Sequence, residues 1–328
     1  TQGRAFWVLD DLFVLRQAAG ADAQSPVYVY APHALAMGRP KNDALDFEGE
    51  NPEPGLPIYY HLAESPGEDV TVTIDILDGS GKVLRTYSSE EREQDRCRIA
   101  GMDPRDPLTL EYPASEAGLQ LWHWNLHADD LPCIDGHTLF EGYGGPAVAP
   151  GHYTVRVTAG SASASAPVKV LPDPRVPATP AETDAWIALQ TRVAGMLEAL
   201  LVSLDTARRA RTQLETLQVR YKDETLAKLA AAATAAIDDW ESGGTELRHE
   251  TFEDEDAWVV KLDGQLRHLL DVVEDGGAPV SRGAMERYAD LEAAWSASRM
   301  AIVVITGNDI KAVNRWAAET SLPLIPEP

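Results

Sequence analysis

The chain has 328 residues, and its 52 Asp and Glu residues outnumber its 28 Lys and Arg residues, for a formal charge of −24. This length favours two to three domains, and the acidic balance argues against nucleic acid or an anionic lipid surface as a partner, because phosphate contacts need clustered basic side chains. Hydrophobic residues make up 44 %, as in a folded chain. The longest apolar run, Met300 to Ile305, is far shorter than the roughly 20 residues that span a bilayer.

The first residues have the character of a buried strand, with the apolar run Phe6 to Leu9 at their centre. A domain seldom begins inside a strand. The chain also starts at Thr1, without Met and without a charged-then-apolar leader. These features predict a processed or partial chain whose targeting segment, if it has one, lies outside it.

Alternating apolar residues and recurrent turns characterise the stretch from about 54 to 172. Asp78-Gly79-Ser80-Gly81 separates two alternating runs and predicts a hairpin with Gly where a positive φ is needed. Strands are expected over 70–77, 82–87, 118–126, 152–159 and 166–171. Short strands spaced by turn signals predict an immunoglobulin- or fibronectin-like β-sandwich over 54–172.

The apolar period becomes helical after a Pro-rich stretch over 173–180, which predicts a stiff linker. Thr179 and Glu182 have the spacing of a capping box. An apolar stripe follows from Trp186 to Tyr221, interrupted by a seven-residue gap at Arg211. This pattern predicts one helix of about five heptads.

Three more helices complete the prediction of an antiparallel helical bundle with long helices over 181–320, followed by a tail over 321–328. They are expected over about 223–240, over about 257–274 with Trp258 facing inward, and from about 281 onward with a kink or end at Gly307. The second and third helices are each about half as long as the first. They must therefore lie end to end along it, or a second subunit must cover the remainder; a homo-oligomer is one expectation.

Three stretches together resemble the C-terminal, post-propeller region of bacterial sortilin-like Asp-box (BNR-repeat) "glycosyl hydrolase" proteins. Residues 1–17 resemble the last propeller blade with its T-H-G-R-x-F-W-V-L-D-D pattern, and 55–62 resemble the G-A-x-I-Y-Y-x-L strand that opens the sandwich of that family. Residues 148–157, together with Leu-Pro-Asp-Pro-Arg at 171–175, resemble its closing strands. Cys97, Cys133 and the 102–117 insert depart from the pattern.

The resemblance implies that residues 1–53 hold the last strands of a β-propeller, over 4–10 and about 26–32, and a connector. It implies a secreted or periplasmic protein whose C-terminal module packs on a propeller or extends from it. Catalytic carboxylates of related glycoside hydrolases lie in propeller loops that have no counterpart here. No catalytic or cofactor-binding residue is therefore carried over.

Apolar strand segments within residues 1–35 would leave unpaired edges. We therefore expect them to pair with a propeller-bearing segment or chain, or with a second copy.

Candidate site residues concentrate between 122 and 137. His123, His127, Cys133 and His137 have side chains that zinc prefers, but their spacing matches no zinc finger or ribbon, so a solvated polar stretch is the favoured interpretation.

Trp122 and Trp124 share one face of a strand. That face either packs in the sandwich core or offers aromatic rings to a glycan.

The chain has two cysteines, Cys97 and Cys133. In an exported protein, as the resemblance implies, two cysteines in one domain would be expected to form a disulfide. The sequence cannot show whether their Cα atoms approach closely enough.

The sequence favours a non-catalytic interaction or assembly module that needs no cofactor. The alternatives are part of a glycan hydrolase whose catalytic propeller is absent from this chain, and a carbohydrate-binding module that uses Trp122 or Trp124. The expected partners are the propeller-bearing segment, a second copy and, in the last alternative, a glycan.

Overall fold

The computed structural model describes residues 11–20, 25–38, 53–67, 70–91, 111–139, 141–248, 254 and 257–320. They form a mixed β and α structure of two compact units. The β unit comprises the described residues up to 91, with 111–129 and 147–177; the helical unit comprises 130–146 and 178–320. The unit boundary near Pro177 falls in the Pro-rich stretch.

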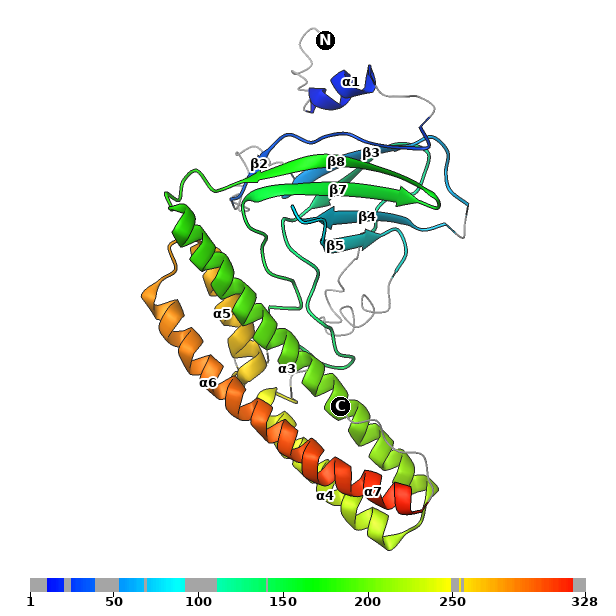
Figure 1. The fold of residues 1–328 in the computed structure, drawn as a ribbon, viewed down its shortest axis with the longest axis vertical. Helices are drawn as coiled ribbons and strands as arrows, with labels where there is room; N and C mark the ends of the chain where they lie inside the picture. The colour runs from blue at the N-terminus through cyan, green and yellow to red at the C-terminus, as the bar shows by residue number, and fades with distance from the viewer. Residues whose placement is uncertain are drawn as a thin grey trace. The chain divides into compact units, whose positions relative to one another are not determined.

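The β unit contains two sheets (Figure 1). Its elements are α1 (Leu12–Ala18), β1 (Val27–Val29), β2 (Leu35–Ala36), β3 (Leu56–Leu62), β4 (Val72–Leu77), β5 (Val83–Ser88), β6 (Gly118–Trp124), β7 (Gly151–Ala159) and β8 (Ala162–Leu171). The smaller sheet has the order β1-β3-β6 and the larger β2-β8-β7-β4-β5. All described pairings are antiparallel except that of β2 with β8.

Both sheets contribute alternate side chains to one hydrophobic core. Ile58 on β3, Ile74 on β4 and Val155 on β7 have no exposed surface. The intervening residues face away, as the period of two in a strand requires. The predicted hairpin is confirmed: Gly81 has φ 87° and donates its N–H to Asp78 O at 2.9 Å, closing the turn between β4 and β5.

Strand β1 is an edge member of the smaller sheet, so one side of the segment over 26–32 pairs within the chain. It pairs with β3 in the register Val27 to Leu62, and Val27 and Val29 lie in the shared core. The apolar face of this strand is therefore buried within the chain. The predicted blade strand over 4–10 lies outside the described residues.

Helix α1, which the sequence did not predict, lies on the outer face of the smaller sheet. Phe13 packs edge-on against Tyr59 with 5.9 Å between ring centroids. The Gln17 side-chain amide bonds both backbone groups of Ala31, at 2.8 and 2.9 Å. The Gln17 side chain thus supplies the hydrogen-bond partners for the backbone of Ala31, which lies just beyond the end of β1.

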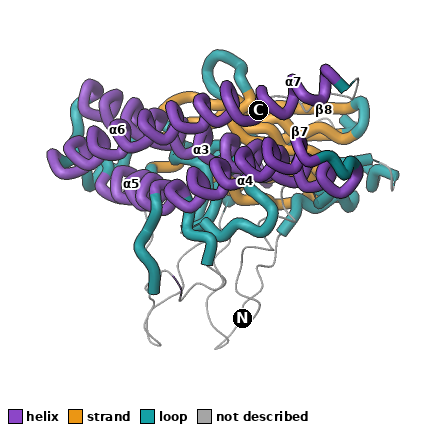
Figure 2. Tube along the Cα trace, turned by 90° about the horizontal axis from the view of Figure 1, so that it is seen from below, coloured by secondary structure: helices purple, strands orange, loops and turns teal. Residues whose placement is uncertain are grey.

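The helical unit contains α3 (Pro180–Arg220), α4 (Glu224–Gly244), α5 (Leu262–Gly276), α6 (Arg282–Ile305), the π-helical turn η2 (Thr306–Ile310) and α7 (Lys311–Glu319). The helices lie alongside one another (Figure 2). The capping box is confirmed, since Glu182 N donates to Thr179 Oγ1 and Thr179 N donates to Glu182 Oε2. Gly307, the predicted kink, lies in the π turn.

Helices α5 and α4 follow one another along α3, as the helix lengths predict (Figure 1). At one end Trp186 Nε1 donates to Val273 O at 2.7 Å. At the other, Arg211 Nη1 lies 2.7 Å from the buried Glu241 carboxylate. The gap in the α3 stripe at Arg211 is therefore occupied by an ion pair. By length and composition α3 could cross a membrane, but half of its most apolar stretch is buried inside the protein.

The predicted third helix is wrong at its start. It begins at Leu262 rather than near 257, so Trp258 lies outside it and remains 37 % exposed. Ser298, a polar residue of α6, contacts α4, because Trp240 Nε1 lies 3.0 Å from both the backbone oxygen and Oγ of Ser298.

Replacing Gln190 by Leu is expected to stabilise the helical unit by about 1–2 kcal/mol. Gln190 is 1 % exposed, and neither atom of its amide has a hydrogen-bond partner in the described structure. Leu has a similar volume and removes the free-energy cost of burying the Gln190 amide without hydrogen bonds. Chemical denaturation measures the change, with Gln218→Leu, a partly exposed position of α3, as the control. Equal or lower stability of Gln190→Leu would show that the amide has a bonded partner in solution.

Candidate functional site

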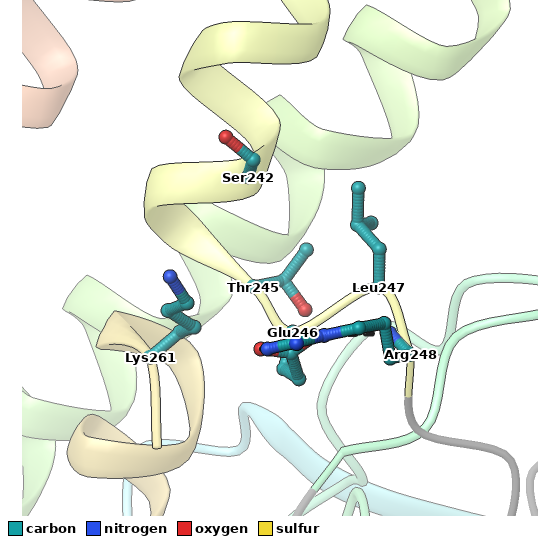
Figure 3. A pocket seen from close by; sticks show the side chains of 6 residues that line it. All are labelled: Ser242, Thr245, Glu246, Leu247, Arg248 and Lys261. Carbon is teal, nitrogen blue, oxygen red and sulfur yellow. Dashed lines mark hydrogen bonds and ion pairs between the residues drawn. The ribbon is translucent and has the colours of Figure 1, made fainter. Parts of the chain in front are cut away.

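A cavity of about 280 Å³ lies in the helical unit, between the end of α4 and the start of α5 (Figure 3). Its lining residues are Ser242, Thr245, Glu246, Leu247, Arg248 and Lys261. Gly243 and Gly244 close α4, and Thr245 caps it with its N–H on Glu241 O at 2.9 Å. The chain then turns away from the axis of α4, so Glu246 and Arg248 lie beyond the end of that helix (Figure 3).

Glu246 and Arg248 form a fixed ion pair at this cavity. Arg248 Nε and Nη2 donate to the two carboxylate oxygens of Glu246 at 2.6 and 2.8 Å. The Trp258 ring stacks on the guanidinium, with 3.6 Å between the ring centroid and Cζ. The hydrogen bonds from Arg248 lower the pKa of the Glu246 carboxyl to about 2, so this group is ionised at neutral pH.

Lys261 is the N-cap residue of α5 and makes no side-chain capping bond there. Its side chain extends from the start of α5 toward the last turns of α4 (Figure 3). Among the described ion pairs and hydrogen bonds, none involves its ammonium group. The positive end of the α5 dipole lies at the same place.

A buried polar cluster lies behind Thr245. His137 Nε2 is 2.8 Å from Thr245 Oγ1 and 3.0 Å from Asp263 Oδ2, and its Nδ1 is 2.5 Å from Tyr143 Oη. The His137 and Asp263 side chains are only 2 % and 6 % exposed. Burial raises the pKa of the Tyr143 hydroxyl, which therefore stays protonated at neutral pH.

This cluster does not have the geometry that activates a nucleophile. A hydroxyl is activated by an unprotonated nitrogen whose ring is held from its other side by a carboxylate. Here Thr245 and Asp263 approach the same nitrogen of His137, whereas Tyr143 Oη lies at the other. Thr245, His137 and Asp263 therefore lack the order of hydroxyl, imidazole and carboxylate that a catalytic triad needs.

The cluster also fixes the segment over 130–146, which the sequence analysis assigned to the sandwich. The structure places this segment in the helical unit. Arg208 Nη1 donates to Asp135 O at 3.3 Å, and Arg267 Nη1 donates to Gly144 O at 2.9 Å. Backbone carbonyls of the segment thus meet guanidinium groups of α3 and α5, contacts that have no sequence signature.

Asp271→Asn is expected to stabilise the protein at pH 8 by about 1–2 kcal/mol, with the advantage shrinking as the pH falls through 6 and lost below 3.8, the ordinary pKa of the carboxyl. Burial raises the pKa of the Asp271 carboxyl to about 6, and the charges of Glu141, Glu274 and Asp275 add to the rise despite Arg267. A raised folded-state pKa favours folding at low pH, and this contribution is lost as the pH rises through 6. Melting temperatures of both proteins across this range test it; a difference that grows toward pH 4.5 would contradict it.

The four residues considered for metal binding are not brought together. His123 and His127 belong to the β unit, whereas Cys133 and His137 belong to the helical unit. His127 Nδ1 contacts the Asn125 backbone oxygen at 2.7 Å. No group of three or more candidate ligands forms within the part of the chain that the structure describes.

The two tryptophans considered for glycan stacking face the core. Trp124 has no exposed surface and packs edge-on against Tyr153, as the core alternative predicts. Trp122 is partly buried and packs against Tyr87 with 5.1 Å between ring centroids. The face of β6 that holds both tryptophans therefore packs against the core of the β unit.

Titration of the denatured, unreduced protein is expected to detect no free thiol. Cys133 is disulfide-bonded, and the sequence contains one other cysteine, Cys97, which lies outside the described residues. Titration after reduction supplies the control, with two thiols per chain as the expected value. Two thiols without reduction would refute the predicted Cys97–Cys133 bridge.

The residues that line the cavity have no motif that would predict a binding site from the sequence. The only local signal is Gly243-Gly244, which marks a helix end but not what lines it. No protein-family model matches the chain, and neither the curated proteins nor the solved structures contain a match. Function must therefore be argued from the residues themselves.

Proposed function

We propose that this chain is a non-catalytic interaction and assembly module, the C-terminal part of a secreted or periplasmic propeller protein similar to the sortilin-like Asp-box proteins. Its partners are a propeller-bearing segment or chain and a second copy of itself. The observation that supports assembly is the edge of strand β6.

Among the described strands, β6 is an edge strand of the smaller sheet. In the described sheets it pairs with β3 on one side only. Residues 118–124 contain no charged residue and no proline, although the chain as a whole is strongly acidic. Leu119 and Leu121 are 50 % and 42 % exposed. Soluble monomers protect such edges with charges, prolines or bulges, so an open apolar edge favours an added strand.

A second copy of β6 is a suitable added strand. Antiparallel pairing about Leu121 would place Leu121 opposite its own copy and Leu119 opposite His123. This arrangement closes as a twofold dimer. It also brings no carboxylate of the strand against another, which matters for a chain with a charge of −24.

Light scattering coupled to gel filtration, over a wide range of protein concentrations, tests the assembly. We expect the wild type to shift from monomer to dimer mass as the concentration rises. Leu121→Lys should remain monomeric, because the twofold axis would place two like charges opposite each other. Leu15→Lys, at a 58 % exposed position of α1, is the matched control and should dimerise. A wild type that is monomeric throughout, or a Leu121→Lys variant that still dimerises, would contradict assembly through β6.

A further inference from the structure

We propose that the cavity between α4 and α5 binds a small carboxylate, held by the ammonium group of Lys261 and the outward N–H groups of Arg248. This site is separate from the assembly edge and does not depend on it. The proposal rests on the charges of the described cavity lining, on the contacts that orient Arg248 and on the chemistry of the cavity wall.

The described lining residues of the cavity carry one more positive than negative charge. Glu246 and Arg248 neutralise each other through two hydrogen bonds. Lys261 then adds one positive charge, which helps to lower the pKa of the Glu246 carboxyl, although its ammonium forms no ion pair within 4.0 Å with the described residues. A single negative charge would complete the balance.

Arg248 is held in place before any ligand arrives. Glu246 occupies its Nε and Nη2 edge, and Trp258 covers one face of the guanidinium. The Nη1 group makes no hydrogen bond to the described residues. A donor fixed in this way loses little side-chain entropy when it binds an anion.

The same geometry favours a carboxylate over a phosphate. Glu246 already uses the Nε/Nη2 edge of Arg248, so a ligand meets only the end-on Nη1/Nη2 edge. Glu246 stays ionised and would repel a second negative charge. Leu247, 52 % exposed, provides an apolar wall for a short hydrocarbon chain. A cavity of about 280 Å³ is large enough for a ligand of a few heavy atoms.

Lys261 has an alternative, structural role, because its side chain extends toward the carbonyl end of α4, where a cation is favourable. The two roles differ in what Lys261→Gln changes. A purely structural role lowers the melting temperature without ligand and leaves ligand binding intact. Carboxylate binding predicts weaker ligand binding in a variant that remains folded.

Calorimetric titration of the full chain with sodium butyrate tests the site, with inorganic phosphate and sodium chloride at matched ionic strength as comparison arms. We expect saturable binding of butyrate to the wild type and to Lys169→Gln, an exposed lysine of β8. The dissociation constant for Lys261→Gln should be at least about tenfold higher.

Leu247→Asp and Leu247→Asn provide a second test that leaves both donors in place. The two side chains are nearly isosteric, so only Asp adds a repelling charge at the exposed wall. Butyrate should therefore bind Leu247→Asp more weakly than Leu247→Asn. The proposal is overturned if butyrate gives no saturable signal, if phosphate binds more tightly, or if Lys261→Gln and Leu247→Asp bind as their controls do.

Discussion

Leu200→Asp is expected to unfold the helical unit, with a loss of at least about 4 kcal/mol. Leu200 has no exposed surface and lies near the middle of α3, on the face that α4 and α5 cover. An Asp there would be a buried charge without a partner. Circular dichroism at 222 nm during thermal or urea denaturation measures the loss.

Val202→Asp is the matched control, because it makes the same chemical change two residues further along the helix. Val202 is 49 % exposed, so its carboxylate would remain in water and the stability should change by less than about 1 kcal/mol. Equal melting temperatures for Leu200→Asp and the wild type would show that the stripe is not buried and would refute the bundle.

His137→Leu is expected to destabilise the helical unit by about 2–4 kcal/mol. The substitution leaves the buried carboxylate of Asp263 without its imidazole partner, which lies 3.0 Å away, and leaves Thr245 Oγ1 without its contact. Hydrogen exchange of the backbone over 134–146 should accelerate, because the cluster holds this segment against the helices. Urea denaturation measures the free energy.

Two further variants show whether the loss of stability in His137→Leu arises from the contact between His137 and Asp263. His152→Leu, on an exposed position of β7, should change stability by no more than about 0.5 kcal/mol. Adding Asp263→Asn to His137→Leu should cost less than the sum of the two single changes, because the charge that lost its partner is removed. Strict additivity would mean that His137 and Asp263 do not interact in solution.

The local elements could be predicted because the interactions that form them lie within a few residues of one another. The capping box needs only Thr179 and Glu182, and the β4–β5 turn needs Asp78 and Gly81. The stripe along α3 follows from the period of the helix. The predicted start of the third helix was wrong because a tertiary contact outweighed the local pattern. Trp258 continues the apolar period of the helix, but it stacks on Arg248 outside the helix.

The strand pattern predicts which faces pack into the shared core of the two sheets, but not which strands pair. Strand β1 shows the difference. Its apolar residues predict a strand, but only the structure shows that β3 of the same chain is its partner. A strand pattern specifies a face and not the edge with which it pairs.

The sequence by itself determined the acidic charge, the change from strand to helix period near residue 180, the hairpin turn and the start of α3, because each depends on composition or on neighbours along the chain. Only the tertiary structure decided that His137 meets Asp263, 126 positions away, and that Arg248 and Lys261 line one cavity. Such contacts arise when separate segments pack to exclude water from a shared core. Their energy depends on burial and distance in space, which spacing along the chain does not encode.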